Sequence, residues 1–204
     1  IVQQNVQTVD DELLGSGRLD LILISEQTEQ FKTIDTFNEL VRRVNESMSF
    51  DLIEGAQDLS LPVKLIHKAF DTSNSQYPKT SEELEQELLF LEFSRGETKT
   101  DVLSSVVDFN YEHSRIEFIT DQLPTSKINE LVAHLTTLFS DWSLGDPIVT
   151  GSQFLSYVLG HYVLQSQFIT VMITFLFVWV LFVSLFGIRL GSLGMIPNML
   201  PMGF

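Results

Sequence analysis

The residues of this 204-residue chain that could do chemistry are its four histidines and its clustered carboxylates. A metal site needs such groups at a spacing that brings them to one face of a helix or one end of a strand. No two of the histidines have a metal-ligand spacing such as His-Glu-x-x-His: they are His67, His113, His134 and His161. We therefore interpret each histidine as a surface or boundary residue and expect no metal ion.

The carboxylates cluster in two places, which are Asp10, Asp11 and Glu12 and, in a predicted helix, Glu82, Glu83, Glu85 and Glu87. We interpret both clusters as solvated, because acids early in a helix favour its N-terminal dipole without binding a cation. The chain has no cysteine, which excludes thiol catalysis, and no glycine motif typical of hydrolases or nucleotide-binding proteins. The sequence thus predicts no enzyme and no cofactor.

Charge divides the chain into two parts. All 27 acidic residues and eleven of the twelve basic residues lie in residues 1–146, which carry a net charge of −16. After Asp146 the only charged residue is Arg189. The acidic part is long enough for one domain with its own core. Its charge argues against nucleic-acid binding, which requires Lys and Arg to displace phosphate counterions.

The second part contains an uncharged segment, 168–188, whose only polar residues are Thr170, Thr174 and Ser184. At about 1.5 Å per residue it spans the roughly 30 Å hydrocarbon layer of a bilayer. A buried core helix rarely runs so long while apolar on all sides, so we predict a transmembrane helix. Because Arg189 follows this segment and no Lys or Arg occurs in the twenty residues before it, we expect residues 1–151 to be extracytoplasmic.

Residues 1–151 alternate strand and helix patterns as an α+β domain does. Five segments have the apolar or alternating pattern of strands: 19–25, 50–54, 106–112, 114–120 and 146–151. Two segments outside an insertion carry apolar residues at helical spacing: 34–46 and 126–140. The order β-α-β, insertion, β-β-α-β predicts a ferredoxin-like sandwich with both helices on one face of the sheet.

The insertion, residues 55–103, is predicted to be helical. One helix opens at Ser60, with Pro62 in its first turn, where the missing N–H does little harm. Another opens at a capping box formed by Thr80 and Glu83.

Two further segments flank the membrane span. Residues 152–167 contain no helix breaker except the tolerable Gly160, so we predict one stiff helix that connects the domain to the span. In residues 189–204, Pro197, Asn198 and Pro201 lie in an apolar stretch, where a polar side chain is costly unless it is partnered. The glycines before them permit a tight turn and close helix contact. We favour a cytoplasmic turn and the start of a closely packed second membrane helix; an ordinary interfacial turn is the alternative.

Val149, Thr150 and Gly151 form a Val-Thr-Gly turn before a long helix, and Arg189 follows the predicted span. Residues 196–201 have the pattern Ile-Pro-Asn-hydrophobic-hydrophobic-Pro. These motifs resemble the resistance–nodulation–division (RND) superfamily, and specifically its branch of predicted exporters of the MMPL type. The resemblance covers most of the chain, and its specific part is the last third.

The resemblance implies a proton-driven inner-membrane transporter, built of two similar halves, that exports lipidic or hydrophobic cargo. This chain is then an excerpt: one extracytoplasmic porter-like domain, the adjoining helix and the start of the next. Its implied partners are the lipid bilayer, the remaining helices, the second porter domain and a hydrophobic or lipid substrate; oligomer formation stays open. Proton-relaying acids are implied in helices beyond this chain. A single-span membrane-anchored sensor or binding module remains the alternative.

Overall fold

A computed structural model describes residues 16–70, 75–93, 102–142 and 144–194. The described residues divide into two compact units, one up to Tyr157 and one from Val158 onward. Several residues singled out above lie outside the described ranges: Asp10, Asp11, Glu12, Pro197, Asn198 and Pro201.

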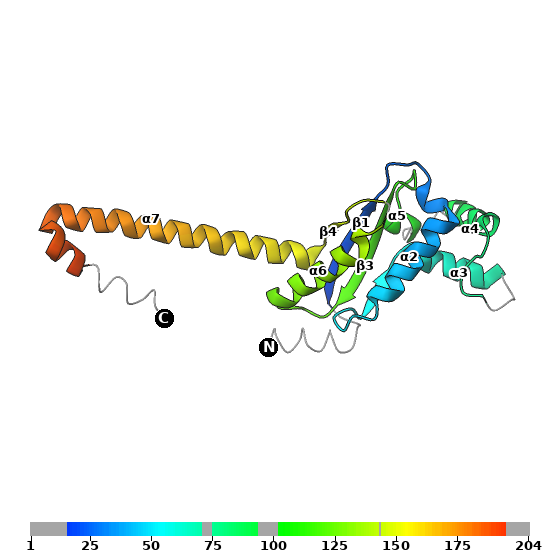
Figure 1. Ribbon diagram of the computed structural model, residues 1–204, viewed down its shortest axis with the longest axis horizontal. Coiled ribbons are helices and arrows are strands. Elements are labelled where there is room, and N and C mark those ends of the chain that lie inside the picture. Colours follow the sequence, from blue (N-terminus) through cyan, green and yellow to red (C-terminus); the bar gives the residue numbers. More distant parts are fainter. Residues whose placement is uncertain (1–15, 71–74, 94–101, 143, 195–204) are drawn as a thin grey trace. The chain divides into compact units, whose positions relative to one another are not determined.

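The chain has a mixed α+β architecture followed by a long apolar helix (Figure 1). The strands are β1 (Gly17–Ile24), β2 (Gly55–Gln57), β3 (His113–Thr120) and β4 (Ile148–Thr150). The helices are η1 (Gln30–Lys32), α2 (Ile34–Ser47), α3 (Ser60–Phe70), α4 (Ser81–Phe93), α5 (Val102–Val106), α6 (Thr125–Ser140) and α7 (Ser152–Gly194).

The four strands form one sheet in the order β2-β3-β1-β4, and each neighbouring pair is antiparallel. The central pair, β1 and β3, is matched over eight residues, from Gly17 opposite Thr120 to Ile24 opposite His113. Alternate residues of β1 are buried, as the period of two in a strand requires: Leu19, Leu21 and Leu23. One face of the sheet therefore carries the core.

Helices α2 and α6 pack side by side against that face, so the helices predicted at 34–46 and 126–140 are confirmed (Figure 1). Each buries the apolar stripe expected from its spacing: Phe37, Leu40 and Val44 in α2, and Ile128, Leu131, Leu135 and Phe139 in α6. The guanidinium of Arg43 donates to the carbonyl of Leu138 and ties the two helices together.

The strand predicted at 50–54 is wrong, because the pairing begins one residue after that segment. Residues 48–54 continue from α2 in turns, with the Phe50 amide donating to the Ser47 carbonyl. Ile53 is buried, so its apolar character serves the core without a strand. The ladder starts where the Glu54 amide donates to the carbonyl of Ile119, and β2 follows inside the segment that was predicted to be an insertion.

The strand predicted at 106–112 is also wrong, although the strand at 114–120 is confirmed as β3. Helix α5 ends at Val106, and only Val107 makes an isolated bridge, to Ser114. Tyr111 has a left-handed φ of 55° and is fully buried, whereas Phe109 is 81% exposed. The two aromatic residues therefore do not share one face, as an alternating strand would require.

The two helices predicted between β2 and β3 are confirmed as α3 and α4. The capping box at the start of α4 is present: the Glu83 amide lies 3.2 Å from the Thr80 hydroxyl that it donates to, and the Glu83 carboxylate accepts the Thr80 amide.

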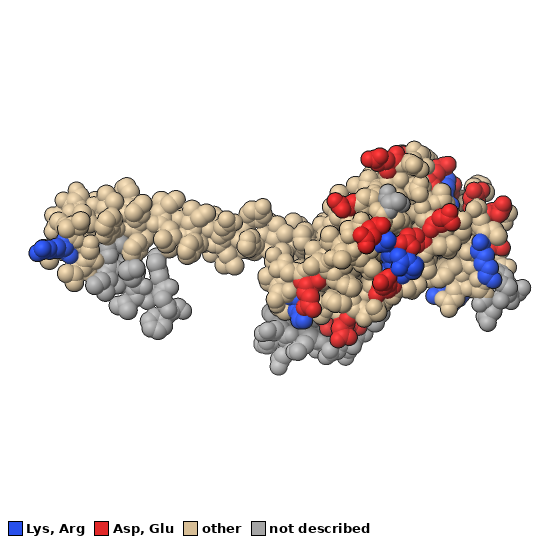
Figure 2. All heavy atoms as spheres, in the orientation of Figure 1, with Lys and Arg blue, Asp and Glu red and all other residues tan. Residues whose placement is uncertain are grey.

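Helix α7 is continuous from Ser152 to Phe186, a length of about 50 Å. Gly187 then leaves the helical region, with φ 79° and ψ 164°, and a short helical segment follows it. Among the described residues α7 is the one helix long and apolar enough to cross a membrane. Acidic and basic side chains cover the α+β unit, whereas the surface of α7 is almost free of them (Figure 2).

Candidate functional site: the two ends of helix α7

The residues before α7 are held by the sheet. Val149 and Thr150 belong to β4 and pair with Leu21 and Asp20 of β1. Gly151 has φ 106°, a conformation that favours glycine, and its carbonyl accepts the first helical hydrogen bond of α7, from the Leu155 amide at 2.9 Å. A Cβ atom at Gly151 would lie 2.8 Å from the carbonyl oxygen of Arg18, so this turn has no room for a side chain.

Gln153 joins the first turn of α7 to the end of β3. Its Nε2 donates to the carbonyl of Asp121 at 3.0 Å, and its Oε1 accepts from the hydroxyl of Thr120 at 2.9 Å. The side chain is 9% exposed and that of Thr120 is fully buried. Within α7, all of whose residues are described, Gln153 is the only buried side chain.

We call these contacts of Gln153 with Thr120 and Asp121 the joint. Gly17, the first residue of β1, has no side chain, and polar atoms of the joint occupy the place where its Cβ atom would lie. A Cβ atom there would lie 2.5 Å from the Thr120 hydroxyl, 2.6 Å from the Asp121 carbonyl oxygen and 2.9 Å from Oε1 of Gln153. Gly17 is part of strand β1. Gly17 and Gln153 are thus two residues of the joint that the sequence analysis does not identify.

At the other end of α7 the chain folds back on itself after Gly187. The indole Nε1 of Trp179 donates to the hydroxyl of Ser192 at 3.2 Å. A Cβ atom at Gly191 would lie 2.7 Å from the backbone of Phe182, so the two arms of this turn touch through their backbones. Arg189 lies in the second arm, two residues after the break.

A buried contact between a histidine and a carboxylate links the two helices of the insertion, and it corrects two expectations. His67 of α3 and Glu87 of α4 are 4% and 6% exposed, and their Nδ1 and Oε1 atoms are 2.6 Å apart. The predictions of a surface histidine and a solvated Glu87 are therefore wrong. Both residues line a hollow of about 470 Å³ together with Phe70 and Phe90. We interpret the pair as a structural link between α3 and α4.

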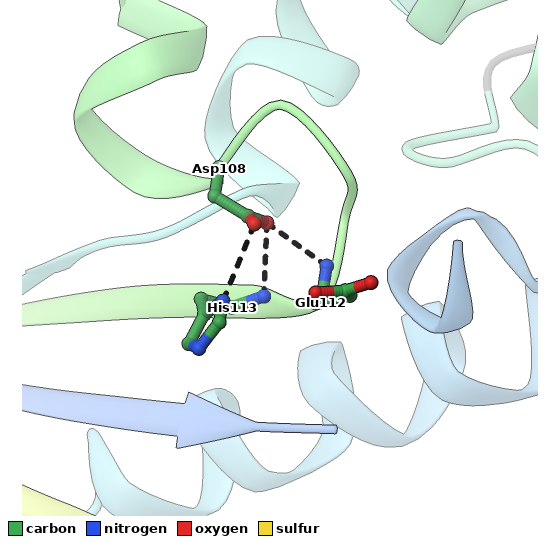
Figure 3. Close-up of side chains that lie close together, drawn as sticks. All are labelled: Asp108, Glu112 and His113. Atoms are coloured by element: carbon green, nitrogen blue, oxygen red, sulfur yellow. Dashed lines mark hydrogen bonds and ion pairs between the residues drawn. The ribbon is translucent and has the colours of Figure 1, made fainter. Parts of the chain in front are cut away.

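Asp108, Glu112 and His113 are the group among the described residues whose donor atoms could surround a metal ion (Figure 3). Asp108 Oδ1 accepts the amides of Glu112 and His113 at 2.9 Å each, and its Oδ2 lies 3.2 Å from Nδ1 of His113. Burial raises the pKa of Asp108, but these hydrogen bonds outweigh it and the pKa is lowered. The carboxylate is thus accounted for by closing the turn before β3.

No family model and no curated protein matches this chain. The geometry at the two ends of α7 is therefore the basis for an assignment of function.

Proposed function

We propose that the chain is part of a polytopic inner-membrane transporter of the RND superfamily, an MMPL-type exporter that uses protons to move lipidic or hydrophobic cargo. The observation that carries this proposal is the passage from β4, which ends with Val149 and Thr150, through Gly151 into a helix that is continuous as far as Phe186. Residues 1–151 are then the extracytoplasmic porter-like domain and residues 152–167 the connecting helix. The span predicted at 168–188 is shortened to 168–186, because the helix breaks at Gly187.

The ferredoxin-like type belongs to the same proposal. It is supported by the strand order β2-β3-β1-β4, by antiparallel pairing throughout and by the position of α2 and α6 on one face. The helices α3 and α4 then form the insertion of the porter-like domain.

The fold-back after Gly187 favours a multi-pass protein over a single-span sensor. A single span continues into water, where polar residues follow it. Here an arm with the apolar residues Ile188, Leu190 and Leu193 returns along α7, and the Trp179 indole has a partner in that arm. Internal partners of this kind are needed where no water can bond polar groups.

The orientation is tested by labelling single cysteines in intact cells. The chain has no cysteine, so each introduced one is its only thiol. A reagent that cannot cross membranes should modify a cysteine at the exposed Ser126 and should not modify one at Leu190, beside Arg189. Labelling at Leu190 alone would contradict the extracytoplasmic position of residues 1–151.

Transport is tested with the full-length protein. Cells that express it should export a lipophilic fluorescent dye, and a protonophore should stop that export. Insertion of Gly-Gly after Tyr157 interrupts α7, at a cost of about 1 kcal/mol for each glycine. We expect this variant to reach the membrane in normal amounts and to lose export. Export at the parental rate would contradict coupling through α7.

A further inference from the structure

The base of α7 is attached to the sheet by hydrogen bonds and not by apolar packing alone. Leu155 and Leu159, the first large aliphatic residues of the helix, are more than half exposed. Gln153 is instead buried, and it reaches the end of β3, 33 residues earlier in the chain. Beside the half-buried Phe154, the first turn is therefore held by a polar contact.

A buried primary amide stabilises a structure only when both its donor and its acceptor are bonded. The amide of Gln153 has a partner on each side: Nε2 donates to the carbonyl of Asp121, and Oε1 accepts from the hydroxyl of Thr120. That hydroxyl also lies 2.9 Å from the Asp121 carbonyl oxygen, so its one hydrogen is shared between two acceptors. The pairing is also directional, so it fixes the rotation of the first turn of α7 about its own axis. An apolar side chain in the same place would permit small rotations.

Two glycines make the joint sterically possible. Gly17 leaves room beside the Gln153 amide, and Gly151 allows the turn to lie against the backbone of β1. The joint therefore has contributions from β1, β3 and the turn after β4.

We infer that Gln153 is a positioning residue that makes the first turn of α7 one rigid body with the ends of β1 and β3. Any displacement of those strand ends then moves the base of the helix. This inference rests on the proposed function for its purpose, which is the transmission of movement between the domain and the span. The attachment itself can be tested without any assay of transport.

The test is hydrogen exchange of the amides of residues 155–158 in the full chain, reconstituted in lipid nanodiscs. Gln153→Leu keeps the size of the side chain and removes both hydrogen bonds. We expect exchange of these amides to become about 30-fold faster, since each of the two bonds contributes roughly a factor of five. Amides in the middle of β1 should keep their rates. Gln165→Leu, the same change at an exposed glutamine farther along α7, is the matched control and should leave these rates unchanged.

Thr120→Val and Gln153→Glu keep the inference testable if Gln153→Leu does not fold. Thr120→Val removes the donor to Gln153 Oε1, together with the contact of that hydroxyl with the Asp121 carbonyl, and leaves the bond from Gln153 Nε2 to Asp121. It should therefore give a smaller increase of the same kind. In Gln153→Glu, a protonated carboxyl restores a donor and an acceptor, so protection should return at a pH below about 4 and be absent at pH 7.

The inference is overturned if the amides of residues 155–158 exchange at the parental rate in Gln153→Leu. Where that variant does not fold, the same result in Thr120→Val overturns it. Equal protection of Gln153→Glu at both pH values would overturn it as well. If the attachment is confirmed and the labelling of Ser126 and Leu190 fails, the joint stands and the transporter proposal does not.

Discussion

The two ends of α7 are fixed by different chemistry. At the end joined to the sheet, a buried amide makes directional hydrogen bonds to Thr120 and Asp121. At the other end, Gly191 brings two backbone segments into contact, and one indole–hydroxyl bond accompanies it. In water, burial is driven by the hydrophobic effect and polar bonds add direction. In a bilayer, lipid is as apolar as leucine, so small residues and close backbone packing take over. The difference supports different solvents for the two ends.

The two tryptophans report on these regions separately. Trp142 lies in the core of the α+β unit, in edge contact with the ring of Phe31 and beside the tilted ring of Phe139. Trp179 lies in α7 and donates to Ser192. Trp179→Phe therefore leaves Trp142 as a fluorescence probe of the domain. Trp142→Phe leaves Trp179 as a probe of the apolar hairpin, by which we mean the end of α7 and the arm 188–194 that folds back along it.

The largest effect should come from Gly151→Ala. The alanine needs a positive φ, which costs about 1–3 kcal/mol, and its Cβ atom meets the backbone of β1, which adds about 1–3 kcal/mol. Gly145→Ala is the matched control, because Gly145 also has a positive φ but no atom within 4 Å of a Cβ atom. Urea unfolding, followed by the fluorescence of Trp142, should show that Gly151→Ala lowers the free energy of unfolding by much more than Gly145→Ala does. Equal losses would mean that the turn does not press against β1.

The next prediction compares the effects of truncating two leucines on the stability of the domain. Leu135 of α6 is fully buried and Leu159 of α7 is 55% exposed. Leu135→Ala should lower the free energy of unfolding of the domain by about 2–5 kcal/mol. Leu159→Ala should change it by no more than about 0.5 kcal/mol. A large effect of Leu159→Ala on the domain would show that the apolar stripe of α7 belongs to the domain core.

A smaller effect is expected at the hairpin. Gly191→Leu would place a side chain against the backbone of Phe182 and Val183, at a cost of about 1–3 kcal/mol. At Gly194 a Cβ atom meets nothing within 4 Å, so Gly194→Leu is the matched control. In nanodiscs, the emission of Trp179 should shift in Gly191→Leu and in Ser192→Ala, and should stay unchanged in Gly194→Leu. A shift with Gly194→Leu alone would contradict the fold-back.

The sequence predicts the elements whose residues follow a local apolar pattern. Helices α2 and α6 and strands β1 and β3 each have such a pattern, and so does the long helix α7. Strand β2 consists of Gly55, Ala56 and Gln57, which have no strand pattern, and it forms because β3 offers an edge to pair with. Its position is a property of the tertiary structure.

The polar contacts were harder to predict for the same reason. Thr120 and Gln153 are 33 residues apart, and no local spacing connects them. Glu87 could have been found, because it lies three residues after Leu84 and one before Leu88, on the buried stripe of α4. His67 likewise follows Val63 by four residues on the buried face of α3. An acid and a histidine on two facing apolar stripes are a signal of a buried pair.

The smallest effect is a pH dependence confined to the domain. Asp58, just before α3, is 2% exposed, and burial raises its pKa although hydrogen bonds from Ser60 lower it in part. The folded state therefore binds this proton more tightly than the unfolded state does. Linkage then requires the contribution of Asp58 to stability to be largest below its unfolded pKa and to fall as pH rises through the folded pKa.

Asp58→Asn tests this, because asparagine stays neutral and can still accept from the Ser60 hydroxyl. The free energy of unfolding of the parent chain minus that of Asp58→Asn should become more positive as pH falls from 7 to about 4. The parent chain then gains stability relative to the variant. Asp108→Asn is the control of opposite sign: its folded pKa is lowered, so the contribution of Asp108 is nearly constant above the unfolded pKa of about 4 and is lost as pH falls below it. The series for this variant therefore continues below pH 4. The emission of Trp179 should not change over this range, since the nearest charged residue in the chain is Arg189. If the parent-minus-variant difference in free energy of unfolding changed with pH in the same direction for Asp58→Asn and Asp108→Asn, burial would not determine the pKa of Asp58. If Trp179 titrated with them, the two ends of α7 would share one environment, and the contrast between them would fail.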